Sequence, residues 1–325
     1  MNIDKYTAKL ISAIITAALL ILLCGGPINA QRYTAWSAPE NLGMVINTPG
    51  FDGCPSVTRD GLNLLYMSNY ESGAQDIYVS HRETNQDSWG EPVSLGSDIN
   101  TALWSEICPM LTISGRYLYF ASDRPGGCGA FDIYVSRRLN KESWTDWGEP
   151  ENLGCLVNSA GPEFSPSLLE DEDGNIQLYF SSGLRPGGLG FGDVWTSYLQ
   201  LDGTFSAAVP VVALNTPSND IRPKIRQRDG LEIFFDSNRP GSILQDLYTS
   251  TRECTSPECP WSTPVSLGTT VNSPGIDGGP ALSFNATELY FMSDRTDLGG
   301  SGGQDIYVIR RERRTGNPVL DVSMK

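Results

Sequence analysis

The sequence Asp132-Ile133-Tyr134-Val135 joins an acid to two branched residues and an aromatic, a composition that favours a short β-strand. Closely similar phrases occur five times along the chain. They begin at Asp76, Asp132, Asp193, Asp246 and Asp305, which places successive copies 56, 61, 53 and 59 residues apart. One four-stranded blade with its loops fits this period, so the repeat predicts a β-propeller.

Three further strands can be assigned around residues 132–135 within the same repeat. Residues 108–113 are separated by a Ser-Gly turn from the aromatic-rich residues 116–122, which is the pattern of a hairpin. A glycine-rich loop then leads to the strand at 132–135. Residues 147–154 contain Pro150, and proline lacks the N–H group that a central strand needs, so this segment suits the outer edge of a blade.

The outer-strand segment indicates how the ring closes. It recurs at residues 36–43, 89–96, 147–154, 205–214 and 261–268. One copy precedes the first full repeat, and none follows the fifth. If the N-terminal copy pairs with the last repeat, it completes the fifth blade and removes the exposed strand edges. The sequence therefore predicts an all-β, five-bladed β-propeller of four-stranded blades, closed by its N-terminal outer strand.

The first 30 residues have the pattern of a secretory signal peptide. Lys5 and Lys9 precede an apolar run over residues 10–23, which is short for a membrane span. Lipid attachment at Cys24 is the less favoured alternative, because a large leucine precedes it. The mature protein would be exported to the periplasm or the cell exterior. The predicted organisation is a signal peptide over 1–30, a propeller over 31–312 and a C-terminal tail over 313–325.

Charge and cysteine content constrain the partners of the protein. Lys and Arg number 23 against 38 Asp and Glu, a net charge of −15, and such a surface repels nucleic acid. Six cysteines follow residue 30, and an even number in an exported chain favours disulfides. The favoured pairs, with others left open, are Cys254–Cys259, Cys128–Cys155 and Cys54–Cys108. With His81 as the single histidine and no paired Cys-x-x-Cys, no zinc site is expected.

Residues 118–127 and 132–135 resemble the WD40-like (PD40) propeller repeat of the TolB type. The same repeat is found beside OmpA-like peptidoglycan-binding domains in bacterial envelope proteins. The resemblance covers residues 36–310 and implies a propeller fold. TolB itself has six blades and a separate N-terminal domain, so its partner binding cannot be carried over residue by residue.

An acidic residue opens every innermost strand. Each follows an Asn-Ser or Asn-Thr pair and precedes a proline by three residues; the five are Asp52, Glu106, Glu163, Asp220 and Asp277. Because innermost strands line the channel of a propeller, we expect the five carboxylates to ring one mouth. Arginines end the neighbouring second strands in four blades, at Arg124, Arg185, Arg239 and Arg295, with Tyr70 in blade 1. Trp104 and Arg222 break the symmetry of the ring and join the five acids as candidate ligand-binding residues.

The acid ring supports a structural and a chemical interpretation. Recurrence in every blade favours carboxylates that accept hydrogen bonds from loop amides or pair with arginine. Catalysis instead needs an acid and a base in different environments. In five-bladed glycosidases of the family 43 type an Asp, an Asp and a Glu occupy successive inner strands. This comparison implies Asp52 as base, Glu106 as modulator and Glu163 as acid.

From the sequence we expect a non-enzymatic binding or scaffold module that recognises a protein or glycan of the cell envelope or exterior at the channel mouth. The alternative is a glycoside hydrolase that uses the inner-strand carboxylates. A single histidine leaves no Ser-His-Asp system. No cofactor is expected. Calcium at residues 171–175 is the one metal considered, and that segment lacks the distal glutamate of a calcium loop.

Overall fold

The computed structural model describes residues 33–70, 73–170, 175–256, 259–300 and 302–314. Residues 36–310 form one compact unit, and residues 33–35 and 311–314 belong to a second unit. The signal peptide, Cys24, most of the acidic 171–175 segment and most of the C-terminal tail lie outside the described residues. Within those residues every regular element is a β-strand, and none is a helix that could cross a membrane.

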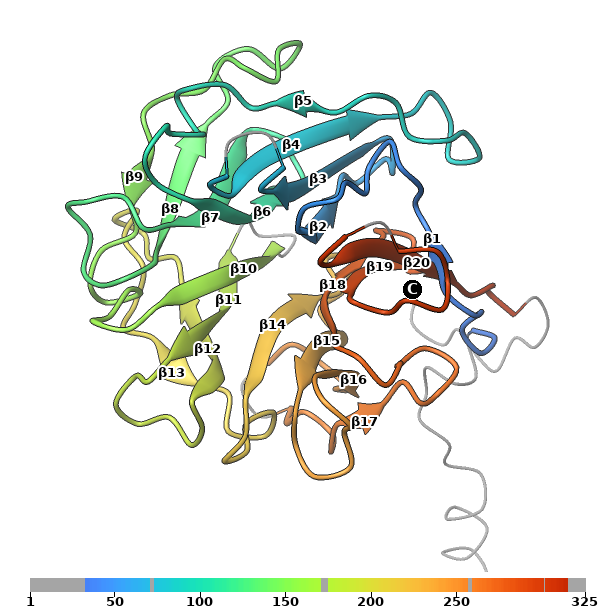
Figure 1. Ribbon diagram of the computed structural model, residues 1–325. Coiled ribbons are helices and arrows are strands. Elements are labelled where there is room, and N and C mark those ends of the chain that lie inside the picture. The colour runs from blue at the N-terminus through green and yellow to red at the C-terminus, as the bar shows by residue number, and fades with distance from the viewer. Residues whose placement is uncertain (1–32, 71–72, 171–174, 257–258, 301, 315–325) are drawn as a thin grey trace, which may run out of the picture. The chain divides into compact units, whose positions relative to one another are not determined.

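The strands form five four-stranded antiparallel sheets around a central axis, as Figure 1 shows. Blade 1 contains β2 (Asp52–Val57), β3 (Asn63–Ser68), β4 (Asp76–His81) and β5 (Val93–Ser94). Blade 2 contains β6 (Glu106–Leu111), β7 (Tyr117–Ser122), β8 (Asp132–Arg137) and β9 (Glu151–Asn152). Blade 3 contains β10 (Glu163–Glu170), β11 (Ile176–Gly183), β12 (Gly192–Tyr198) and β13 (Val209–Pro210).

Blade 4 contains β14 (Asp220–Ile225), β15 (Glu232–Ser237), β16 (Asp246–Thr251) and β17 (Val265–Ser266). Blade 5 contains β18 (Asp277–Leu282), β19 (Glu288–Ser293), β20 (Asp305–Arg310) and β1 (Glu40–Asn41). The predicted five-bladed β-propeller is therefore confirmed. Each outer strand is only two residues long, in keeping with the proline in or beside it.

The ring closes between the two ends of the compact unit. Strand β1 pairs antiparallel with β20, with Asn41 opposite Tyr307. The side chain of Asn47 accepts a hydrogen bond from the amide of Ile306 at 2.7 Å and donates to its carbonyl at 3.0 Å. Figure 1 shows the blue β1 beside the red β20. The N-terminal outer strand thus completes blade 5, as expected.

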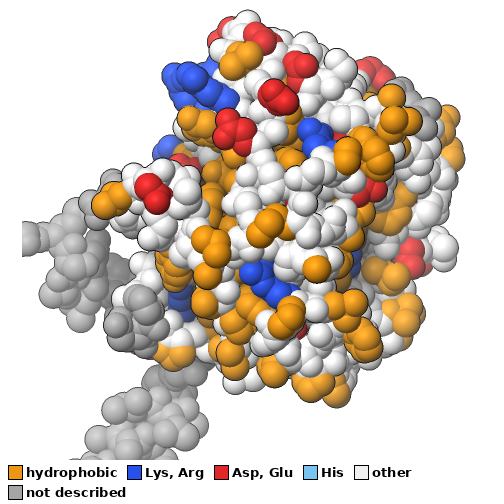
Figure 2. Space-filling view, turned by 90° about the vertical axis from the view of Figure 1, so that its left-hand side faces the viewer, with side chains coloured by type: hydrophobic (Ala, Val, Ile, Leu, Met, Phe, Trp, Pro, Cys, Tyr) orange, Lys and Arg blue, Asp and Glu red, His pale blue; other side chains and the backbone are white. Residues whose placement is uncertain are grey.

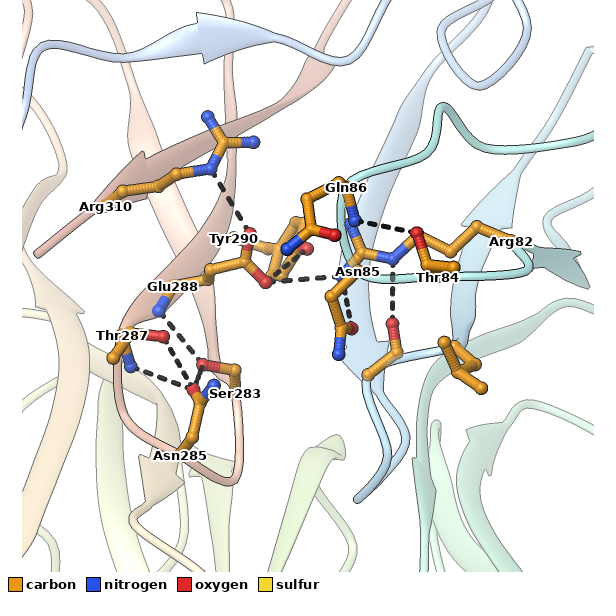
Figure 3. Close-up of polar contacts among 12 residues, drawn as sticks. Arg82, Thr84, Asn85, Gln86, Ser283, Asn285, Thr287, Glu288, Tyr290 and Arg310 are labelled. Carbon is orange, nitrogen blue, oxygen red and sulfur yellow. Dashed lines mark hydrogen bonds and ion pairs between the residues drawn. The ribbon is translucent and has the colours of Figure 1, made fainter. Parts of the chain in front are cut away.

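Contacts between blades are both apolar and ionic. Trp89 of blade 1 packs edge-on against Tyr290 of blade 5, with ring centres 6.2 Å apart. Arg82 lies over Trp89, 4.3 Å from its centre, and donates to Glu288 at 3.3 Å. Glu288 also accepts hydrogen bonds from Arg310 at 3.2 Å and Tyr290 at 3.1 Å (Figure 3). This shared carboxylate links the first and last blades.

Three disulfides cross-link the fold, in the pairs that the sequence favours: Cys54–Cys108, Cys128–Cys155 and Cys254–Cys259. The first joins the innermost strands of blades 1 and 2, and the second joins two loops of blade 2. Such bonds persist in oxidising compartments, so they indicate an exported protein.

Candidate functional site

The five acids that open the innermost strands all lie at one end of the channel, and the structure buries them completely. Each accepts hydrogen bonds from the backbone and hydroxyl of the serine or threonine that precedes it in the entry loop. Asp277, for example, accepts from the Ser273 amide at 2.5 Å and the Ser273 hydroxyl at 2.8 Å. The acids therefore hold the entry loops in place.

Arginine reinforces this arrangement to a different degree in each blade. Arg239 and Arg295 donate to Asp220 and Asp277, each at 2.5 Å. In blade 2, Arg124 donates to Glu106 at 3.1 Å. In blade 3 the nearest nitrogen of Arg185 lies 3.9 Å from Glu163, and its hydrogen bonds go to the carbonyls of residues 156 and 157 instead.

Asp52 in blade 1 is the clearest exception. The described residues provide no arginine within ion-pair distance of Asp52, and Tyr70 occupies the position that arginine has elsewhere. Thr48 donates twice to Oδ2, at 2.6 and 2.8 Å, while Oδ1 is buried without a hydrogen-bond partner. The hydroxyl of Ser68 lowers the pKa of Asp52, but it does not lie within hydrogen-bond geometry of Oδ1. Asp52 is thus the ring acid with the fewest donors.

Burial governs the protonation of three of these carboxyl groups. Loss of hydration raises the pKa of Asp52, Glu106 and Glu163 above their ordinary values. Hydrogen bonds from serine and threonine act in the opposite direction, and Arg124 and Arg185 also lower the pKa of Glu106 and Glu163. A carboxyl group with a raised pKa is the kind that can serve as a general acid.

The raised pKa of Glu163 predicts a pH-dependent stability. Unfolding restores a pKa near 4.5, so above that pH the folded protein holds a proton that the unfolded chain releases. The contribution of Glu163 to the free energy of unfolding is therefore fully present below about pH 4.5. It is lost as pH rises through the pKa of Glu163 in the folded protein. We expect the difference in unfolding free energy between wild type and Glu163→Gln to fall over this interval, measured by urea unfolding between about pH 4 and pH 8.

Glu149→Gln, at an exposed position, is the matched control, and its pH profile should follow that of the wild type. A difference between wild type and Glu163→Gln that stays constant with pH would contradict the raised pKa.

Below the acids, each innermost strand contains a β-bulge at the residue before its proline. These five residues have left-handed backbones, with φ of 46° at Cys54, 52° at Cys108, 53° at Ser165, 54° at Arg222 and 57° at Gly279. Such φ values are uncommon for residues other than glycine. The repeated Asn-Ser/Thr, acid and proline spacing coincides with the bulge, which the alternation of a strand does not indicate.

The bulge layer obstructs the channel. Arg222 donates to both oxygens of Asp236, at 2.8 and 2.6 Å, and the disulfide and Ser165 face this pair. Lys224 extends across to the sulfur of Met110 in blade 2 at 3.7 Å, and burial lowers the pKa of Lys224 to about 8. The remaining void is about 10 Å³, room for roughly one water molecule. Arg222 is thus already paired with the carboxylate of Asp236. Because the channel is filled below the acids, a ligand at the acid end of the propeller would bind at the channel mouth.

Hydrophobic side chains surround that mouth. Most exposed large hydrophobic residues of the described chain lie on loops at the acid end, among them Met44, Tyr70, Leu103, Trp104, Leu156, Leu184, Phe191, Val212, Ile243 and Leu298. Trp104 is 37% exposed and Phe191 is 73% exposed. Figure 2 shows that hydrophobic side chains are also spread over the flank of the ring near β9 and β13. Aromatic rings beside buried carboxylates are typical of sites that bind small molecules such as sugars.

The acid of the repeated Asp-Ile-Tyr phrase has a local role. Asp193 accepts hydrogen bonds from the amides of Leu189 and Gly190 at 2.8 and 3.1 Å, so it fixes the glycine-rich loop before its own strand. Among the described residues no group of three or more His, Cys, Asp and Glu side chains is arranged to hold a metal ion.

Many solved β-propellers share this fold at low sequence identity. An α-L-arabinofuranosidase from Lactobacillus brevis has a TM-score of 0.57 and 12% identity, covering 85% of this chain and 93% of that chain. An endo-arabinase from Bacteroides thetaiotaomicron has a TM-score of 0.56 and 14% identity, covering 84% and 97%. A GH62 α-L-arabinofuranosidase domain from Coprinopsis cinerea has a TM-score of 0.54 and 12% identity, covering 86% and 96%. Identities this low establish the fold alone.

These structures correct the expectation of a non-enzymatic binding or scaffold module. The three propellers named above are described as arabinofuranosidases and an endo-arabinase, so they favour the alternative, a glycoside hydrolase. No family model matches the sequence, and no curated protein does. The resemblance to the TolB-type repeat therefore stays a prediction from the sequence.

Proposed function

We propose that this protein is an exported glycoside hydrolase that acts at the acid end of the propeller, in the periplasm or outside the cell. The observation that carries the proposal is the broken symmetry of the acid ring. No arginine of the described chain pairs with Asp52, and Glu163 is the arginine-paired acid with the longest separation, 3.9 Å. Assignment of the repeat to the TolB-type family also remains a proposal, which rests on the repeated phrases of the sequence.

Asp52 and Glu163 open the inner strands of blades 1 and 3, which approach each other across the channel. Two residues beyond them, the sulfur of Cys54 lies 4.0 Å from the hydroxyl of Ser165. In the proposed reaction Asp52 accepts a proton from water as general base. Glu163, with its raised pKa, donates a proton to the leaving oxygen of the glycosidic bond. Both acids are buried, so the entry loops at residues 47–51 and 158–162, which cover Asp52 and Glu163 respectively, must open for a substrate to reach them.

The substrate class follows from the loops and from the related folds. Trp104 and Phe191 offer exposed aromatic faces against which sugar rings stack. Since the similar propellers are described as arabinofuranosidases and arabinanases, we propose arabinose-containing polysaccharides as the first substrates to test.

The proposal is tested by incubating the protein with arabinan, arabinoxylan and a panel of other polysaccharides. Released sugars are identified by mass spectrometry. We expect Asp52→Asn and Glu163→Gln each to reduce turnover by about a hundredfold or more, which is the usual contribution of a general acid or base. Asp297→Asn, an exposed acid in a loop at the same end, is the matched control and should retain full turnover.

Folding of each variant is checked by thermal unfolding. If the wild type releases no product from any polysaccharide, or if both variants turn over at the wild-type rate, the proposed function is wrong.

A further inference from the structure

A cleft of about 470 Å³ lies at the end of the propeller opposite the acid ring. It is formed by the first hairpins of blades 1 and 2, by the loop that follows β8, and by Phe284 from the first hairpin of blade 5. Its volume falls within the range of small-molecule sites. The cleft shares no residue with the acid ring or the channel, so it is a separate candidate site.

Three cations line this cleft, and two of them lie over aromatic rings. The guanidinium of Arg59 lies 4.7 Å from the ring centre of Phe284, and that of Arg138 lies 3.7 Å from the ring centre of Trp144. Lys141 donates to the carbonyl of Ser114 at 2.8 Å. Stacking on an aromatic ring orients a guanidinium group. Less side-chain conformational entropy is therefore lost when its N–H groups bind an acid.

These cations have no carboxylate partner. No Asp or Glu of the described chain lies within ion-pair distance of Arg59, Arg138 or Lys141, although acids outnumber bases 38 to 23 in the whole sequence. Glu142 is the acid whose charge acts on Arg138, and it lies in the exposed loop.

The cleft is lined by one acid, Asp60, and a second acid, Glu170, lies near the hairpins; both accept hydrogen bonds from the protein. Asp60 accepts from the hydroxyl of Thr58 at 2.6 Å and from the amide of Leu62 at 3.0 Å, within its own turn. Glu170 accepts from the amide of Ile113 at 3.1 Å. The cleft therefore concentrates unpaired positive charge in a protein that is strongly acidic as a whole.

We propose that this cleft binds the carboxylate of a uronic acid residue in an acidic oligosaccharide. Arg59 and Lys141 provide the exposed charged donors, and the buried Arg138, whose Nε donates to the carbonyl of Ser143 at 2.8 Å, adds positive charge behind them. Planar guanidinium groups match a carboxylate in two parallel hydrogen bonds. That the ligand is a saccharide rests on the proposed function. That the ligand carries an acidic group rests on the cations of the cleft alone. A uronate site here would tether an acidic polysaccharide at the end remote from the acid ring.

The test is isothermal titration calorimetry with trigalacturonate, using the wild type and the Asp52→Asn variant so that turnover cannot consume the ligand. We expect binding by both proteins, weakened about tenfold by Arg59→Gln and by Lys141→Gln and weakened further at high salt. Both side chains are exposed, so the fold should be kept, and thermal unfolding checks this. Arg137→Gln, an exposed arginine outside the cleft, is the matched control and should bind like the wild type.

Three outcomes would overturn the proposal. The first is no binding of trigalacturonate, and the second is equal binding of its uncharged methyl ester. The third is competition by inorganic phosphate at equal concentration with the same dependence on Arg59 and Lys141, which would assign the cleft to phosphorylated ligands. Because binding is measured without turnover, a failure here is distinct from a failure of the hydrolase proposal.

Discussion

A chain that begins at Gly43 is expected to lose at least about 5 kcal/mol of its unfolding free energy and to aggregate. The truncation removes β1 and with it the hydrogen bond from Leu42 to Ile306 at 3.1 Å. It also removes Trp36, whose ring centre lies 6.1 Å from that of Phe234. Trp36 is half-buried, so its loss costs less than the about 3–5 kcal/mol of a fully buried tryptophan, and each lost hydrogen bond adds about 1 kcal/mol. In addition, β20 becomes an unprotected edge that other chains can pair with.

Urea unfolding and size-exclusion chromatography measure the two consequences of this truncation. A chain that begins at Tyr33 is the control and should remain monomeric, with an unchanged unfolding midpoint. A synthetic peptide spanning residues 33–46, added in excess, should restore part of the lost stability by binding at the vacant edge. If the truncated chain unfolds at the same midpoint as the control, closure by β1 contributes little to the stability of the ring.

Asp277→Ala is expected to lower the free energy of unfolding by about 3–5 kcal/mol, because it leaves a buried arginine without its partner. Arg295 is nearly inaccessible and donates to Asp277 at 2.5 Å. The same change also leaves the Ser273 amide without its acceptor. Asp297→Ala, at an exposed position, should change stability by less than about 0.5 kcal/mol.

Chemical unfolding of a double-mutant cycle separates the two contributions. The variant carrying both Asp277→Ala and Arg295→Met should be more stable than the sum of the single changes predicts, since no unpaired charge remains. Asp52→Ala leaves no arginine behind, so it should cost less than Asp277→Ala. A loss below about 1 kcal/mol for Asp277→Ala would mean that the acid ring does not stabilise the fold.

The propeller architecture was predictable because the pattern of each strand type recurs five times in the sequence. The Asp-Ile-Tyr strand, the proline-containing outer strand and the inner-strand acid each recur, so an error in one blade is corrected by the others. The closure was also predictable, since the outer-strand segments are offset by one repeat from the rest. The cysteine pairs followed from the blade positions of Cys54 and Cys108 and the short spacing of Cys254 and Cys259.

The candidate site was less predictable for physical reasons. The recurrence of the acids indicated a ring, but their burial depends on how closely each entry loop folds over its carboxylate. The pairing of Arg222 with Asp236 joins two strands through a bulge that periodicity does not reveal. The cleft opposite the ring combines Arg59, Lys141 and Phe284, which lie in three blades and share no motif.

The function expected from the sequence was wrong in its main part for an identifiable reason. Recurrence of the acid in every blade favours a structural role, whereas the environments of the five acids differ: within the described residues no arginine pairs with Asp52, and the nearest nitrogen of Arg185 lies 3.9 Å from Glu163. Tyr70 marks the difference at Asp52 in the sequence, but residue types do not reveal the difference at Glu163, because Arg185 is present and directs its hydrogen bonds to carbonyl groups.

The pairing of β1 with β20 has a consequence for biosynthesis. Asn41 is among the first propeller residues to leave the ribosome, and its partner Asp305 follows 264 residues later. Blades 1 to 4 can form as they are translated, but the ring cannot close until β20 has also been translated. Until then β1 has no partner strand, and the blades already formed remain an open array. The pairing of β1 with β20 is therefore the step that converts this open array into a closed ring.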